Sequence, residues 1–221
     1  MKPLLETILS RKLFDPKIAI YNWLDQYGIK NYTLNDRGEI DVDGDVDLSY
    51  KDIEEFPYFI QFGVVKGYFS CSDNELTSLK GSPREAGGSF NCQNNKLTTL
   101  EGAPKEVSGD FLCHNNKLTS LKGSPNKVEG CFTCYYNQLT SLEGAPEVVG
   151  GGFYCYSSNL TSLEGAPREV GGGFYCQRNN LKDLKGAPVK VEGYFNCSNN
   201  STHFTEEDIM NVCKVEDGIR V

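Results

Sequence analysis

Seven cysteines recur at a constant spacing of 21 residues, and this period constrains the fold more than any other feature of the sequence. They are Cys71, Cys92, Cys113, Cys134, Cys155, Cys176 and Cys197. A phenylalanine stands two residues before each cysteine. An asparagine stands three residues after it at Asn74, Asn95, Asn116, Asn137, Asn179 and Asn200, with Ser158 in the remaining repeat. Only stacked, near-identical units keep so strict a period. The sequence therefore predicts one continuous solenoid.

One repeat reads F-x-C-x-x-N-x-L-x-x-L-x-G-A-P-x-x-V-x-G, and its residue types predict how each unit folds. Phe and Cys alternate with polar residues, so both side chains point inward from a short strand. The side-chain amide of Asn can satisfy backbone groups that the turn would otherwise bury unpaired. Gly-Ala-Pro does not continue a helix, so we expect an extended or turn-like return limb.

This motif resembles the leucine-rich-repeat consensus L-x-L-x-x-N-x-L, with Phe and Cys in place of the two strand leucines. The likeness is to the short 21-residue bacterial and phage-type members, and it covers residues 44–202. The resemblance implies an α/β repeat solenoid that is mostly β. Such a rod has a parallel β-sheet on a concave face, an extended or turn-like convex side, and helical caps at both ends.

We expect three segments along the chain. Residues 1–43 form an N-terminal helical and hairpin cap, with Asp15 capping a helix that starts at Pro16. Residues 44–202 form the solenoid, and residues 44–66 are an atypical, slightly longer first repeat. Residues 203–221 form a C-terminal helical cap. A capping box at Thr205 predicts a helix that runs to Lys214 with Val212 facing inward.

Charge and composition exclude several functional classes. The chain has 221 residues and a net charge of −8, and residues 36–55 alone carry −7. No long basic stripe exists, which argues against nucleic acid as a partner. No apolar run approaches the roughly 20 residues of a membrane span, and no export signal precedes the repeats. We therefore expect a cytoplasmic protein.

The cysteine ladder has three interpretations: buried free thiols, a disulfide framework, or a metal site. Inward cysteines at this spacing behave as small apolar residues, so free thiols are favoured and neither a metal nor a cofactor is expected. Cys131 lies off the period and is a candidate exposed, reactive thiol.

Alternating acids from Asp41 to Asp47 suggest calcium, but neither frame of an EF-hand loop fits, because Leu48 or Val46 occupies the glycine position. The alternation favours a strand with a solvated acidic face. A weak cation site, or a basic partner for residues 36–55, stays open.

Catalytic machinery is scarce, and the chain is interpreted as non-enzymatic with no catalytic residue. His114 follows Cys113 directly, and adjacent strand residues point to opposite faces, so the two do not form a nucleophilic pair.

Positions beside the cysteines vary and predict the exposed face. Tyrosines gather there over three repeats, and tyrosine and arginine are enriched at interfaces. The candidate partner-binding residues are His114, Thr133, Tyr135, Tyr136, Tyr154, Tyr156, Tyr175, Gln177 and Arg178. The alternative is a tyrosine ladder that serves stability alone.

The favoured hypothesis is a module that binds a protein through the concave face. Its resemblance to proteins of tailed phages implies expression in a bacterial host and engagement of a host protein, such as a defence component. The first alternative is a structural solenoid that assembles with itself. The second is a binder of nucleotides or small ligands.

Overall fold

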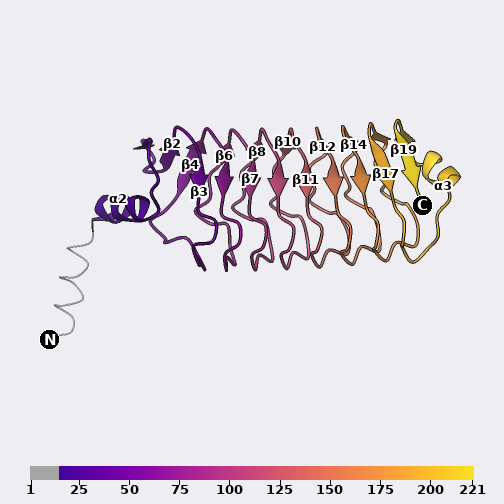
Figure 1. The fold of residues 1–221 in the computed structure, drawn as a ribbon, viewed down its shortest axis with the longest axis horizontal. Helices are drawn as coiled ribbons and strands as arrows, with labels where there is room; N and C mark the ends of the chain where they lie inside the picture. The colour runs from indigo at the N-terminus through magenta and orange to yellow at the C-terminus, as the bar shows by residue number, and fades with distance from the viewer. Residues whose placement is uncertain (1–14) are drawn as a thin grey trace.

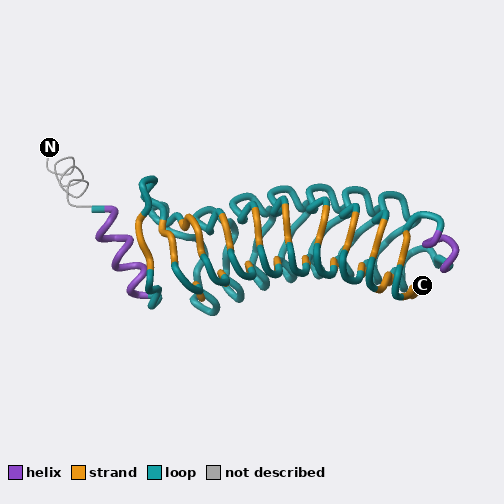
Figure 2. Tube along the Cα trace, turned by 90° about the horizontal axis from the view of Figure 1, so that it is seen from above, coloured by secondary structure: helices purple, strands orange, loops and turns teal. Residues whose placement is uncertain are grey.

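The computed structural model describes residues 15–221, which form an elongated rod with the helix α2 at one end and α3 at the other (Figure 1). It is a parallel β-solenoid of about nine turns, as the cysteine period predicts. Most turns contribute one short strand to each of two sheets, and the strands succeed one another along the rod (Figure 2).

The Phe-x-Cys segments form a nine-stranded sheet in which neighbouring strands are parallel. Pairing is in register, with Phe132 opposite Phe111 on one side and Phe153 on the other. Its strands are β3 (Val46–Asp47), β5 (Phe69–Ser70), β7 (Phe90–Asn91), β9 (Phe111–Leu112), β11 (Phe132–Thr133), β13 (Phe153–Tyr154), β15 (Phe174–Tyr175), β17 (Tyr194–Asn196) and β19 (Gly218–Arg220).

The return limb forms a second, ten-stranded sheet. An extended limb is expected from Gly-Ala-Pro, but its hydrogen-bonded ladder is not. The strands are β1 (Tyr32–Leu34), β2 (Ile40–Val42), β4 (Phe62–Val65), β6 (Glu85–Ala86), β8 (Glu106–Val107), β10 (Lys127–Val128), β12 (Val148–Val149), β14 (Glu169–Val170), β16 (Lys190–Val191) and β18 (Lys214–Val215). All pairs are parallel except the hairpin β1–β2.

The core is a set of side-chain columns that run the length of the rod. The repeat phenylalanines, cysteines and leucines are almost completely buried. The rings of Phe69, Phe90 and Phe111 stack with centroids 5.5 Å apart. Every turn therefore buries its apolar residues against the next, which a unit of 21 residues cannot do alone.

The asparagine column supplies the polar part of the core, as predicted. Asn95 donates from Nδ2 to the carbonyl oxygens of Cys71, Cys92 and Gln93, at 3.0, 3.2 and 3.1 Å, and its Oδ1 accepts from the backbone N–H of Leu76 at 2.9 Å. One amide thus joins two turns: it pairs the buried N–H of Leu76, and it shares three carbonyls with the amides of Asn74 and Asn116 and the N–H of Asp73.

Helix α2 (Pro16–Gln26) lies at the N-terminal end of the rod. The side chain of Asp15 caps it and Pro16 begins it, as predicted. Trp23 packs edge-on against Phe56 and Phe62, with ring centroids 6.3 and 6.2 Å away, so the helix covers the first apolar layer. The part of the predicted helical cap that precedes Asp15 lies outside the described residues.

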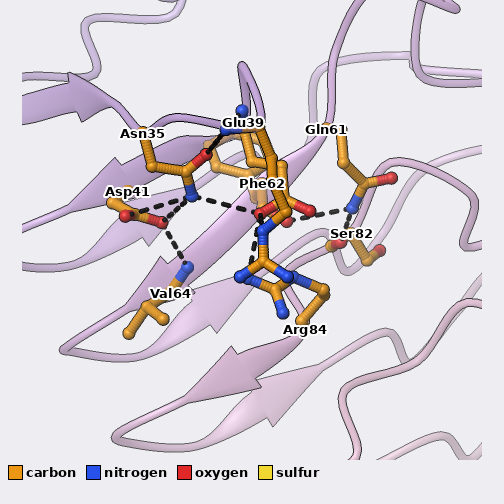
Figure 3. A network of polar contacts seen from close by, with 9 residues as sticks. Asn35, Glu39, Asp41, Gln61, Phe62, Val64, Ser82 and Arg84 are labelled. Carbon is orange, nitrogen blue, oxygen red and sulfur yellow. Dashed lines mark hydrogen bonds and ion pairs between the residues drawn. The ribbon is translucent and has the colours of Figure 1, made fainter.

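A polar network fastens the β1–β2 hairpin to the ten-stranded sheet (Figure 3). The Oδ1 of Asn35 accepts from the backbone N–H groups of Arg37 and Glu39 and closes the turn. The carboxylate of Asp41 accepts from Val64 N at 2.8 Å, and Glu39 pairs with Arg84 at 2.9 Å. Glu39 and Asp41, both from the acidic residues 36–55, are therefore held in place by this network.

The atypical first repeat, predicted for residues 44–66, pairs with the second repeat as a turn of the solenoid. Val46 pairs with Phe69 and Asp47 with Ser70, so Val46-Asp47-Leu48 takes the place of Phe-x-Cys at an offset of 23 residues. Ile53 and Phe56 are buried in the places of the two repeat leucines.

At the C-terminal end one expectation is wrong. Helix α3 (Glu206–Met210) begins with the capping box of Thr205 and Asp208, but it ends four residues before Lys214. Lys214 opens β18 and extends the ten-stranded sheet, and Val212 is 45% exposed instead of facing inward. This terminus therefore combines a five-residue helix with a further solenoid turn.

Candidate functional site

The outward face of the nine-stranded sheet carries the candidate residues in columns. Because neighbouring strands are in register, residues 21 positions apart lie side by side. We call the positions just before, just after and two after each ladder cysteine the outward columns. They hold the Thr133, Tyr135 and Tyr136 of one turn and their equivalents in the next.

Six aromatic side chains meet there, and we call them the aromatic patch: His114, Tyr135, Tyr136, Tyr154, Tyr156 and Tyr175. His114, Tyr135 and Tyr156 stack in the column after the cysteines, with centroids 4.2 and 4.4 Å apart. Tyr136 lies edge-on to Tyr135 and Tyr156. These four of the predicted residues therefore lie in contact with one another.

Tyr154 and Tyr175 form a second stack, with centroids 4.8 Å apart. Each leans over a glycine of its own turn: a Cβ at Gly152 would lie 2.7 Å from the ring of Tyr154, and one at Gly173 would lie 2.5 Å from the ring of Tyr175. Other turns carry Ser89, Asp110 or Cys131 at this position. The sequence signal is the Gly-Gly-Gly-Phe-Tyr that occurs twice, at residues 150–154 and 171–175.

Burial shapes the chemistry of the patch. Burial lowers the pKa of His114, and the nearby negative charge of Asp73 offsets part of this effect. Nδ1 of His114 lies 2.9 Å from the hydroxyl oxygen of Thr133. Burial also raises the pKa of Tyr156 to about 12, with Tyr135 adding to the effect. Both shifts favour the neutral forms of His114 and Tyr156 at neutral pH.

The remaining predicted residues have different surroundings. Thr133 is buried, and its hydroxyl lies within hydrogen-bond distance of Nδ1 of His114. Gln177 is half-buried in the column of Tyr156, and its Oε1 has no hydrogen-bond partner among the described residues. Arg178 is exposed at the edge of the sheet.

The edge column two residues after each cysteine has an unusual backbone. All seven of its repeat residues are left-handed, with φ from 50° to 57°. Asp and Asn tolerate this conformation, and they occupy it at Asp73, Asn94, Asn115 and Asn199. Tyr136 (φ 51°) and Arg178 (φ 55°) do not suit it, and sequence reasoning missed this column although its Asn-Asn pairs hinted at it.

Cys131 and Cys134 have the C-x-x-C spacing of redox and zinc sites, a pattern that the sequence-based interpretation overlooked. Cys134 points into the core and is buried, whereas Cys131 is half-buried outside it, because residues three apart on a strand face opposite sides. All nine cysteines are free thiols. Within residues 15–221, no group of three His, Cys, Asp or Glu side chains is arranged to hold a metal ion.

Thiol labelling is expected to distinguish these cysteines. In native buffer a maleimide should modify Cys131 rapidly and leave the seven ladder thiols and the buried Cys213 protected. Mass spectrometry of the labelled protein measures this, with Cys131→Ser as the control that abolishes fast labelling. Rapid modification of all nine thiols would contradict the inward ladder.

Neither described helix is long and apolar enough to cross a membrane. Comparison of the chain with family models, curated proteins and solved structures finds no match.

Proposed function

We propose that this chain is a non-enzymatic, leucine-rich-repeat-type module of the cytoplasm that binds a partner protein through the aromatic patch. The observation that carries the proposal is Tyr136, a bulky residue that is left-handed and 50% exposed. A left-handed non-glycine residue costs about 1–2 kcal/mol. Asparagine would fill this place at a lower cost, as it does in the turns of Asn94 and Asn115.

A tyrosine ladder that served stability alone would not need this residue. Strain of this kind concentrates at functional sites, where a surface must present a particular side chain. The patch also has the character of an interface, because stacked tyrosines offer large, rigid rings with polar ends at a low cost in side-chain entropy. Arg178 is a second residue of this column whose type does not suit the left-handed conformation, and it lies two turns after Tyr136.

The identity of the partner follows from the resemblance to phage proteins. On that analogy the partner is a protein of a bacterial host, and binding would inhibit a defence component. Function has to be argued from the site and not from the fold. The experiment therefore identifies the partner as the protein whose capture depends on the patch residues.

The test is affinity capture from bacterial lysate followed by quantitative mass spectrometry. Tyr136→Asn and Tyr156→Gln each install the residue that neighbouring turns carry in the same column, so both variants should fold. We expect each to weaken capture of the partner by at least tenfold, as at an interface hot spot.

The matched control is Tyr50→Asn. Tyr50 is also left-handed (φ 56°) and exposed, but it lies in the first turn, away from the patch. Both asparagine variants should raise the melting temperature, and only Tyr136→Asn should lose the partner. Equal recovery by all variants would disprove the patch.

A further inference from the structure

The outward columns carry charge only at their ends. Among the described residues in these columns, the formally charged ones are Asp47 and Asp73 at the N-terminal end and Arg178 and Arg220 at the C-terminal end. Between Asp73 and Arg178 the columns hold polar and aromatic side chains, including the aromatic patch. The binding face is therefore bipolar, negative at one end and positive at the other.

These four charges have no counter-ion in the part of the chain that the structure describes. None of them takes part in an ion pair with another described residue. Asp73 accepts from Nδ2 of Asn94 at 2.7 Å, and Asn94 in turn accepts from Asn115 at 2.8 Å. The two amides point their donors toward Asp73 and hold its carboxylate in place. A partner can therefore meet full charges at both ends.

The distance between the two ends follows from the topology. Asp73 follows β5 and Arg178 follows β15, which is five strand spacings away in the sheet. At about 4.8 Å per spacing this is roughly 24 Å, or about seven residues of an extended chain. The face itself is narrow, because a short strand turns only alternate side chains outward.

We propose that the partner lays an extended segment along the rod axis, basic at one end and acidic about seven residues further on. Its basic side chains meet Asp47 and Asp73, and its acidic ones meet Arg178 and Arg220. The residues between them contact the aromatic patch, whose hydroxyls donate to backbone carbonyls of the segment. This inference rests on the proposed function and adds the chemistry and direction of the partner.

Because the protein has a net charge of −8, the acidic end of the partner segment is the more selective of its two ends. An acidic group is repelled by the protein as a whole, most strongly near residues 36–55, so it gains only where arginine stands without a nearby carboxylate. Complementary charge at both ends thus fixes the direction of the segment and favours one register over others.

The probes are two fluorescein-labelled peptides of about twelve residues with identical composition. One carries two lysines and two glutamates separated by about seven residues, with leucine, phenylalanine and serine between them. The other has the same four charged residues mixed at its centre. Fluorescence anisotropy at about 20 and 300 mM salt measures binding. We expect the bipolar peptide to bind at least tenfold more tightly at low salt, with the difference shrinking at high salt.

Arg178→Asn, which restores the asparagine of its column, should remove this preference. Arg168→Asn is the control, because Arg168 is also exposed but lies beside β14 of the other sheet, where it pairs with Glu169. Equal binding of the two peptides overturns the inference. So does a natural partner whose binding needs Tyr136 but not Arg178, although the proposed function then stands. Self-association in sedimentation that Arg178→Asn abolishes would show that a second copy occupies the face, which also overturns it.

Discussion

Raising the pH from 8 to 10 is expected to unfold the solenoid cooperatively. Burial raises the pKa of six ladder thiols above their ordinary value of about 9. The six are Cys71, Cys92, Cys113, Cys134, Cys155 and Cys176. In the unfolded chain these thiols ionise near pH 9, whereas in the folded chain they keep their protons. The folded state then binds more protons than the unfolded state, so stability falls as the pH rises.

The size of the effect follows from the number of thiols. Each contributes a loss of about 1.4 kcal/mol per pH unit above 9, so six contribute about 8 kcal/mol per unit. Domains of this kind are typically stable by about 5–15 kcal/mol. Below pH 8 the contribution is fully present. Circular dichroism between pH 7 and 11, with a reductant present, measures the transition.

Cys134→Ala is the variant that tests the mechanism. It removes one buried thiol, so the variant should be less stable at pH 7 but lose stability more slowly above pH 9, by about 1.4 kcal/mol per unit. Urea unfolding at several pH values separates the two effects. An unfolding free energy that stays constant from pH 8 to 10 would contradict the buried ladder.

Asn95→Ala is expected to lower the free energy of unfolding by about 1–3 kcal/mol, because it leaves the buried N–H of Leu76 without its partner and removes one of two donors from the carbonyls of Cys71, Cys92 and Gln93. The affected groups belong to two turns, so the variant should also weaken the coupling between them. Urea denaturation measures the change. Asn180→Ala is the control, since Asn180 is exposed and its loss should cost less than about 0.5 kcal/mol. A loss below about 1 kcal/mol for Asn95→Ala would count against the amide column.

The column also contains its own natural gap at Ser158, where the hydroxyl only accepts a long hydrogen bond of 3.4 Å from the backbone N–H of Asn137. Ser158→Asn would give the carbonyls of Cys134 and Cys155 a second amide donor beside Asn137 and Asn179, as the carbonyls of Cys113 and Cys176 have in their turns. We expect a gain of about 1 kcal/mol, the opposite sign to Asn95→Ala.

Much of this fold could be predicted because its determinants repeat. The inward positions of Phe and Cys follow from the alternation, and the role of Asn follows from the need to pair buried backbone groups. The first turn could be recognised although Val46 and Leu48 replace Phe and Cys, because the replacements are apolar at the same spacing.

Features that depend on two turns at once were harder to foresee. The second sheet arises because the return limbs stack, not because Glu-Val favours a strand. The left-handed column, the leaning of Tyr154 over Gly152, and the burial of Thr133 each require the neighbouring backbone to be placed first. At the C-terminal end α3 stops at Met210, since the chain can extend both sheets by pairing Lys214 with Lys190 and Ile219 with Phe195.

Because the turns pair in register, the number of turns sets the distance between the two charged ends of the face. Each added or deleted turn would move Arg178 relative to Asp73 by one strand spacing, about 4.8 Å, without changing any contact inside the other turns. The length of segment that matches the two charged ends would change by about one and a half extended residues per turn. Duplication or loss of a single 21-residue unit could therefore retune which partner fits, in discrete steps and without rebuilding the core.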